Sequence, residues 1–199
     1  MKKLLFVSLF IICTFAASAQ WSIAPELGLS AFSHNNGGSD GWRPAVKAGA
    51  ALEYAFRPHF SLESGLYYTQ RGYSLAGRIS IPDDWDRWEF GPERPSLVRH
   101  LLQVPIRARF SWEIAEDTRF FVSAGAYVGA YFANDWKQTT IMQGADYGKA
   151  FDWGVTATVG IEVKRWFFRL GYDISLAKEY DDGISPKYHV GTISIGYKF

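Results

Sequence analysis

The sequence predicts an all-β protein, an eight-stranded antiparallel up-and-down transmembrane β-barrel. Three observations predict this fold. Apolar and polar residues alternate with a period of two in eight segments. The connections between these segments are alternately long and short. Aromatic residues make up 17% of the chain, with 8 Trp, 11 Tyr and 15 Phe, and such rings gather where a membrane barrel meets the two water interfaces.

The clearest alternating segment is 102–112. Leu102, Val104 and Ile106 lie on its apolar face, whereas Arg107 and Arg109 lie on the other. Burying two arginines in a soluble core without partners would be very costly, so their face is expected to line a polar lumen. The seven other segments are 22–30, 46–54, 60–71, 120–129, 152–162, 168–175 and 192–199. Each approaches the roughly 9–11 residues with which a tilted strand crosses a bilayer.

The connections support the same fold independently. Long ones are expected near 33–43, 74–96, 132–150 and 177–187, and short ones near 55–59, 113–119 and 164–166. Outer-membrane barrels have short periplasmic turns and longer extracellular loops. With eight strands, both termini fall on the side of the short turns, and we expect that side to be periplasmic.

The first 19 residues have the features of a cleaved signal peptide. Lys2 and Lys3 precede the apolar run Leu4–Phe15, and 17–19 is a small-residue cleavage site. The alternative is a transmembrane anchor, but the run is shorter than the roughly 20 residues that a spanning helix needs. Export followed by membrane insertion implies an outer membrane of Gram-negative type. The expected domains are therefore a signal peptide over 1–19 and one barrel domain over 20–199.

The chain's single cysteine, Cys13, lies inside this predicted signal. Acylation there is disfavoured because the bulky Ile11 and Ile12 precede it. The barrel domain should therefore contain no disulfide. Overall charge is nearly balanced, with 21 Lys and Arg against 20 Asp and Glu. We expect no nucleic-acid partner, since binding one calls for a basic excess.

The polar faces of the segments define the expected lumen. Their charged residues are Glu26, Lys47, Glu53, Glu63, Arg71, Arg107, Arg109, Asp152, Glu162, Arg169 and Asp173. Six acids and five bases are almost neutral together, which predicts an ion-paired network filling the lumen. A charged conduit is the alternative, but an eight-stranded barrel is only wide enough for side chains to fill it.

Small residues share the lumen face. Nine glycines lie there, namely Gly28, Gly49, Gly65, Gly125, Gly129, Gly154, Gly160, Gly171 and Gly196. Large lumen groups such as Arg107 and Tyr127 need small neighbours in a narrow interior. The lumen is therefore expected to alternate large and small side chains.

Rings near the segment ends predict two aromatic girdles. One should lie by the short turns and comprise Trp21, Tyr54, Phe60, Trp112, Phe120, Trp166, Phe167 and Tyr197. The other should lie by the long loops and comprise Tyr68, Tyr73, Trp136, Phe151, Trp153 and Tyr188. Phe199 follows Tyr197 on the same face, and this terminal pair resembles the signal that barrel-assembly machinery reads.

Three stretches carry a family resemblance. The run 100–110, His-Leu-Leu-Gln-Val-Pro-Ile-Arg-Ala-Arg-Phe, resembles the central-strand signature of the PorT-like family of small outer-membrane barrels. The Gly- and Ala-rich stretch 121–131 resembles that family's next strand, and 151–154, Phe-Asp-Trp-Gly, resembles a further strand start. The resemblance implies an outer-membrane barrel and supplies no catalytic residue.

Catalytic and metal chemistry find little support. The four histidines, His34, His59, His100 and His189, are scattered, so no metal site and no cofactor are expected. Ser96, His100 and Asp84 could be assembled near one long loop, but no nucleophile-elbow spacing accompanies them. We therefore expect a protein that is not an enzyme, with a membrane-embedded enzyme as a minor alternative.

The long loops are the expected site of outside contacts. Trp85, Trp88 and Phe90 lie among charges in 74–96 and suit either contact with an extracellular protein or glycan, or a cap over the barrel mouth. The predicted function is thus a monomeric outer-membrane barrel, in contact with lipid and the assembly machinery, with a structural or loop-interaction role. A narrow channel remains an alternative. A soluble lipocalin-like binder would need apolar residues inside and polar ones outside.

Overall fold

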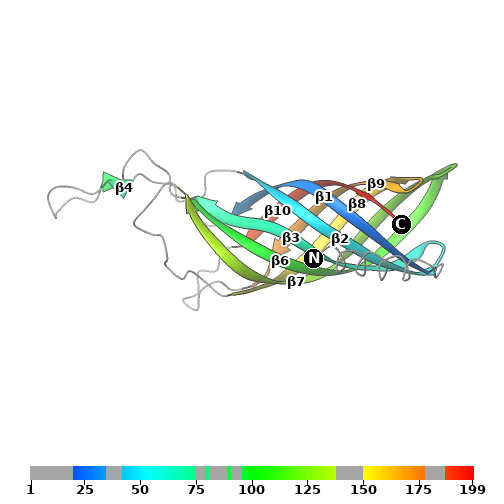
Figure 1. The fold of residues 1–199 in the computed structure, drawn as a ribbon, viewed down its shortest axis with the longest axis horizontal. Coiled ribbons are helices and arrows are strands. Elements are labelled where there is room, and N and C mark those ends of the chain that lie inside the picture. Colours follow the sequence, from blue (N-terminus) through cyan, green and yellow to red (C-terminus); the bar gives the residue numbers. More distant parts are fainter. Residues whose placement is uncertain are drawn as a thin grey trace, which may run out of the picture.

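The computed structural model describes residues 20–34, 42–74, 79–80, 89–90, 96–137, 150–177 and 187–199. Its strands are β1 (Trp21–His34), β2 (Arg43–Arg57), β3 (Phe60–Ser74), β4 (Ile79–Ser80), β5 (Glu89–Phe90), β6 (Ser96–Ala115), β7 (Thr118–Lys137), β8 (Phe151–Val163), β9 (Trp166–Ser175) and β10 (Tyr188–Tyr197). Eight of them close into one barrel in the order β1-β10-β9-β8-β7-β6-β3-β2, and β4 and β5 pair separately (Figure 1).

Every strand pair in the barrel is antiparallel, and the first and last strands close it. On β1, Glu26 faces Gly196 of β10 on one side and Gly49 of β2 on the other. The predicted eight-stranded antiparallel barrel is therefore confirmed. Within the residues that the structure describes, no helix is long and apolar enough to cross a membrane.

The connections sort to the two ends of the barrel. Tight turns join β2 to β3, β6 to β7 and β8 to β9, and Asp117 and Lys164 in the last two have positive φ of 57° and 56°. We call this the turn end; residues 20 and 199 also lie there, because Ala55 N donates to Gln20 O and Phe199 N donates to Ile23 O. The opposite end is the loop end.

Several strands run further than the alternation indicated, β6 and β7 by the most. Each of β6 and β7 has 20 residues, so 132–137, expected in a loop, lie in a strand, as do 113–115. The β6–β7 ladder continues past a register shift between His100 and Leu101. Antiparallel pairing requires no apolar face once a hairpin leaves the bilayer, so alternation marks only its lipid-facing part. The two-residue strands β4 and β5 within 74–96 were also not predicted.

The barrel is apolar outside and polar inside. Leu29 and Ile193 are 73% and 67% exposed, whereas Glu63 and Arg71 are completely buried. This arrangement confirms the facing that the alternation predicts. It also excludes the lipocalin-like alternative, which needs the reverse.

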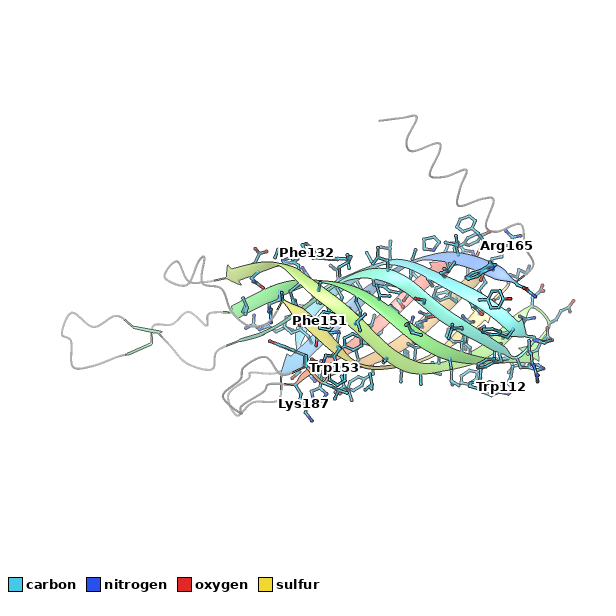
Figure 2. The ribbon with its side chains drawn as sticks, turned by 90° about the horizontal axis from the view of Figure 1, so that it is seen from below. Trp112, Phe132, Phe151, Trp153, Arg165 and Lys187 are labelled. Atoms are coloured by element: carbon cyan, nitrogen blue, oxygen red, sulfur yellow. The ribbon has the colours of Figure 1, made fainter. Side chains whose placement is uncertain are left out.

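Exposed rings lie near both ends of the barrel. Figure 2 shows Trp112 near the turn end, and Phe132, Phe151 and Trp153 toward the loop end. Phe167 and Tyr188 were wrongly assigned to the girdles: they are 1% and 2% exposed, because their positions have lumen parity. Their nearness to strand ends suggests a girdle, but the alternation places both on the lumen face. The side chains of two other predicted girdle residues, Tyr73 and Trp136, lie outside the described set.

Candidate functional site in the barrel lumen

The centre of the lumen is organised around Glu63 of β3. Its carboxylate accepts hydrogen bonds from Arg107, on the neighbouring strand β6, and from Arg169 Nη2 of β9 at 2.6 Å. Arg109 Nη1 lies 3.5 Å away. Strands β3 and β9 are four places apart in the closed order of eight, so the Arg169–Glu63 pair joins opposite walls of the barrel.

A second carboxylate, Glu26 of β1, extends this cluster. Arg169 bridges the two acids, because its Nη1 donates to Glu26 Oε2 at 2.9 Å. Tyr67 Oη and Ser194 Oγ donate to the same carboxylate at 3.0 and 2.6 Å. Lys47 Nζ lies 3.7 Å from Glu26 Oε1. The charge of Glu26, which is only 1% exposed, is therefore balanced and hydrogen-bonded within the barrel.

The turn end has its own cluster of two acids and two bases. Arg109 donates to Glu53 at 3.2 Å and to Glu162 at 2.5 Å. Lys198 Nζ, just after β10, lies 2.9 Å from Glu53 and 3.0 Å from Glu162. Each carboxylate thus has two cations, and Arg109 connects this cluster to Glu63.

The loop end of the lumen is organised around Arg71 of β3. Its Nη1 donates to Asp152 of β8 and, at 2.6 Å, to Tyr127 Oη, while its Nη2 lies 3.9 Å from Asp173 of β9. Ser175 Oγ donates to the other oxygen of Asp152 at 2.5 Å. Arg71 therefore links β3 to two strands across the lumen, as Arg169 does at the centre.

Buried rings fill the space between these charges. Tyr67, Phe121, Tyr127 and Phe167 are each at most 1% exposed. Each ring faces a glycine on the adjacent strand, in the pairs Gly49–Tyr67, Phe121–Gly160, Tyr127–Gly154 and Phe167–Gly196. Guanidinium groups also lie over them: Arg109 Cζ is 3.8 Å from the centre of Phe121, and Arg169 Cζ is 4.9 Å from that of Phe167. Arginines of the lumen therefore lie over its buried rings.

All eleven lumen residues predicted from sequence face inward. Ten of them are buried, and the eleventh, Glu53, is half-buried. Two further lumen cations were not predicted, namely Lys198 and Arg99, which is 2% exposed and lies over Tyr131. Both occupy positions of lumen parity: Arg99 lies just before the 102–112 segment, whereas Lys198 lies within 192–199 and follows from the alternation there.

The other predicted contact residues are only partly described. Trp85 and Trp88 lie outside the described residues, and the backbone of Phe90 belongs to β5, paired with Ile79. At the carboxyl end, Phe199 is 57% exposed and its ring centre lies 5.0 Å from that of Tyr197. The terminal rings therefore lie together at the turn end.

Outside the lumen, His100 takes part in a short hydrogen-bonded chain. Its Nδ1 lies 2.7 Å from Tyr68 Oη, and its Nε2 lies 2.9 Å from Asp135 Oδ2. Asp84, which the disfavoured set of Ser96, His100 and Asp84 would require, lies outside the described residues. In the described part of the chain, no group of three or more His, Cys, Asp or Glu residues could hold a metal ion.

The described charges of the lumen are close to balance. Its described charges comprise six carboxylates and seven cations once Arg99 and Lys198 are added. Some buried polar atoms have no hydrogen-bond partner among described residues, including Arg71 Nε, Gln103 Oε1 and Thr156 Oγ1. The carboxylates are nonetheless surrounded by cations, as a stable buried network requires.

Solved structures of small outer-membrane barrels are similar to this chain. OprG from Pseudomonas aeruginosa is 13% identical with a TM-score of 0.55, covering 91% of this chain and 96% of that one. Outer membrane protein W of E. coli is 16% identical with a TM-score of 0.46, covering 92% and 100%. Ail of Yersinia pestis, solved with the heparin analogue sucrose octasulfate, is 12% identical with a TM-score of 0.45, covering 90% and 99%.

The OprG similarity supports the fold alone. No protein in the curated set matches the sequence. The family model for the outer membrane protein beta-barrel domain matches residues 15–181. With its lipid-facing apolar surface and its closed antiparallel barrel, this chain belongs to the outer membrane protein beta-barrel domain family and is a protein of the outer membrane.

Proposed function

We propose that this protein is a plugged barrel with a structural or loop-mediated interaction role, and neither a channel nor an enzyme. The Arg169–Glu63 pair at 2.6 Å carries the proposal, because it joins opposite walls at the centre of the lumen. Arg71 does the same nearer the loop end. A solute would have to break these buried pairs to pass, and eight-stranded barrels leave little other space.

We also propose an orientation, with the turn end and both termini in the periplasm and the loop end outside. The sorting of tight turns to one end supports it. Export would use residues 1–19 as a cleaved signal, and the Tyr197–Phe199 pair would be read by the barrel-assembly machinery. Membership of the PorT-like branch, suggested by 100–110, belongs to the same proposal.

The orientation can be tested on intact cells with single cysteines, because the only native cysteine lies in the predicted signal. Lys187→Cys, exposed at the loop end, should react with a membrane-impermeant maleimide, whereas Arg165→Cys at the turn end should not (Figure 2). Both should react after the outer membrane is permeabilised. Labelling of Arg165→Cys alone on intact cells would reverse the orientation.

The plug can be tested by planar-bilayer recording of the refolded barrel. We expect no stepwise conductance from the native protein. The double variant Arg169→Ala with Arg71→Ala removes both cross-lumen links. It is the variant in which we expect conductance to appear. Steady unitary steps from the native chain would contradict the plug.

The proposed outside partner is a protein or glycan bound through the loops. Replacing 75–95, which holds Trp85 and Trp88, by a two-residue Asn-Gly turn removes the candidate contacts while β3 and β6 remain paired. Cells carrying the native chain should bind particular members of an immobilised glycan and matrix-protein array, and cells carrying the shortened chain should not. Equal binding by both cell types would remove this loop from the proposal.

A further inference from the structure

A cavity of about 310 Å³ opens at the turn end, beneath the β2–β3 turn. Its charged lining comprises Arg57, Arg109, Arg119 and Lys198 with Glu53 and Glu162. We propose that this cavity is a binding site for a small multivalent oxyanion, bearing phosphate or clustered carboxylate groups. The plugged-barrel role does not require such a site.

The floor of the cavity is already neutral. Glu53 and Glu162 each pair with both Arg109 and Lys198, and Ser61 Oγ donates to Glu53 at 2.7 Å. These two carboxylates therefore have their countercharges at contact distance. They leave the remaining lining cations largely uncompensated.

Those remaining cations are Arg57 and Arg119, both exposed on the cavity wall. Neither forms an ion pair or side-chain hydrogen bond with any residue that the structure describes. Arg119 has Glu113 and Glu162 as register partners on β6 and β8. Glu162 is taken by Arg109 and Lys198, and Glu113 makes no ion pair with Arg119. The cavity lining thus carries two more cations than anions. The guanidinium groups of Arg57 and Arg119 are the two that pair with no described residue.

Two free guanidinium groups beside one cavity specify the ligand chemistry. A guanidinium binds phosphate or carboxylate oxygens through two parallel hydrogen bonds, and two such groups favour a ligand with at least two negative charges. The cavity volume suits a small molecule or one charged end of a larger one. If the turn end is periplasmic, as proposed above, the ligand is a periplasmic one; the binding itself does not depend on that orientation.

The test uses the full barrel in nanodiscs of zwitterionic lipid, titrated calorimetrically at fixed ionic strength. Pyrophosphate and citrate are the probes, and they distinguish the phosphate source from the carboxylate source. Saturable binding of either probe with one site per barrel is expected. Arg57→Gln and Arg119→Gln should each weaken it by about 10-fold, the size of a lost charge-assisted hydrogen bond.

The matched control is Lys164→Gln with Arg165→Gln, which removes two exposed cations from the same end but outside the cavity. This control removes the same charge as Arg57→Gln combined with Arg119→Gln. Unlike that pair, it should leave the affinity for the probes unchanged. Absence of saturable binding by both probes, or equal weakening in the control, would overturn the site. Maleimide labelling and conductance test the proposed function separately, so the two can fail independently.

Discussion

The ring of Phe121 on β7 occupies the space that a side chain at Gly160 on β8 would need. A Cβ on Gly160 would lie 2.4 Å from Phe121 Cζ. Similar contacts occur at Gly196, where a Cβ would lie 2.2 Å from Phe167 Cζ, and at Gly154, 2.6 Å from Tyr127 Oη. These glycines are thus required by close packing against the lumen rings and, at Gly160 and Gly154, also against the carbonyl oxygens of Phe168 and Ile174 at 2.3 and 2.0 Å.

Replacing Gly160 by alanine should therefore destabilise the barrel. Because Phe121 is held between Gly160 and Arg109, it cannot move away without cost, and we expect a loss of about 1–3 kcal/mol in the free energy of unfolding. Urea titration of the protein in lipid vesicles, followed by tryptophan fluorescence, measures it. Gly171→Ala is the control, since its Cβ would meet nothing closer than 3.6 Å. Equal losses in the two variants would contradict the packing account.

Neutralising Glu63 should have a larger effect. Glu63→Gln leaves Arg107 and Arg169 buried beside a neutral amide, and removing one partner from a buried network costs about 3–5 kcal/mol. The same urea titration applies, with the exposed Glu113→Gln as control, where a change within about 0.5 kcal/mol is expected. Adding Arg107→Met to Glu63→Gln should recover part of the loss, and strict additivity of the two substitutions would argue against a shared network.

The position of the bilayer can be tested with two substitutions of one type on β6. Ile106 is 56% exposed in the middle of the apolar outer face, and Ile114 is 59% exposed at the turn end beyond Trp112. Ile106→Arg should cost about 2–4 kcal/mol and Ile114→Arg about 0–1 kcal/mol, following the depth dependence of charge in a bilayer. Folding free energies into vesicles provide the comparison. A larger cost for Ile114→Arg than for Ile106→Arg would show that the bilayer surrounds a different part of the barrel.

The terminal aromatic pair provides a test that separates assembly from stability. Phe199 N donates to Ile23 O at 2.9 Å, a bond that survives Phe199→Ala, and the side chain is largely exposed. The purified variant should therefore unfold within about 0.5 kcal/mol of the native chain. In cells, its level in the outer membrane should fall several-fold if the ring is part of an assembly signal. Unchanged levels in a membrane-fraction immunoblot would remove that role.

The sequence predicts the barrel well because lipid imposes a strict rule on its outer face. Every second residue from Leu102 to Trp112 must be apolar, so the alternation itself marks strand, facing and register parity. Outside the bilayer that rule lapses. This explains why 132–137 looked like a loop although it pairs with β6, and why the short β4–β5 pair escaped notice.

Composition of the lumen was also predictable, but its connectivity was not. Parity places Arg169 and Glu63 inside, yet only the closed order of strands brings β9 opposite β3. The cavity at the turn end was likewise not visible, because Arg57 and Arg119 are near two different turns in the sequence. Parity also identifies Phe167 as a lumen ring, and it should have outweighed the position of Phe167 near a turn.

The pairing of β1 with β10 has a consequence for biogenesis. Glu26 acquires Ser194 as a partner only when the last ten-residue strand has docked, and until then β1 and β9 both present unsatisfied backbone edges. Such edges recruit other chains. A barrel without β10 would thus expose two unpaired strand edges at once, so copies of this protein must be kept apart until the last strand has docked.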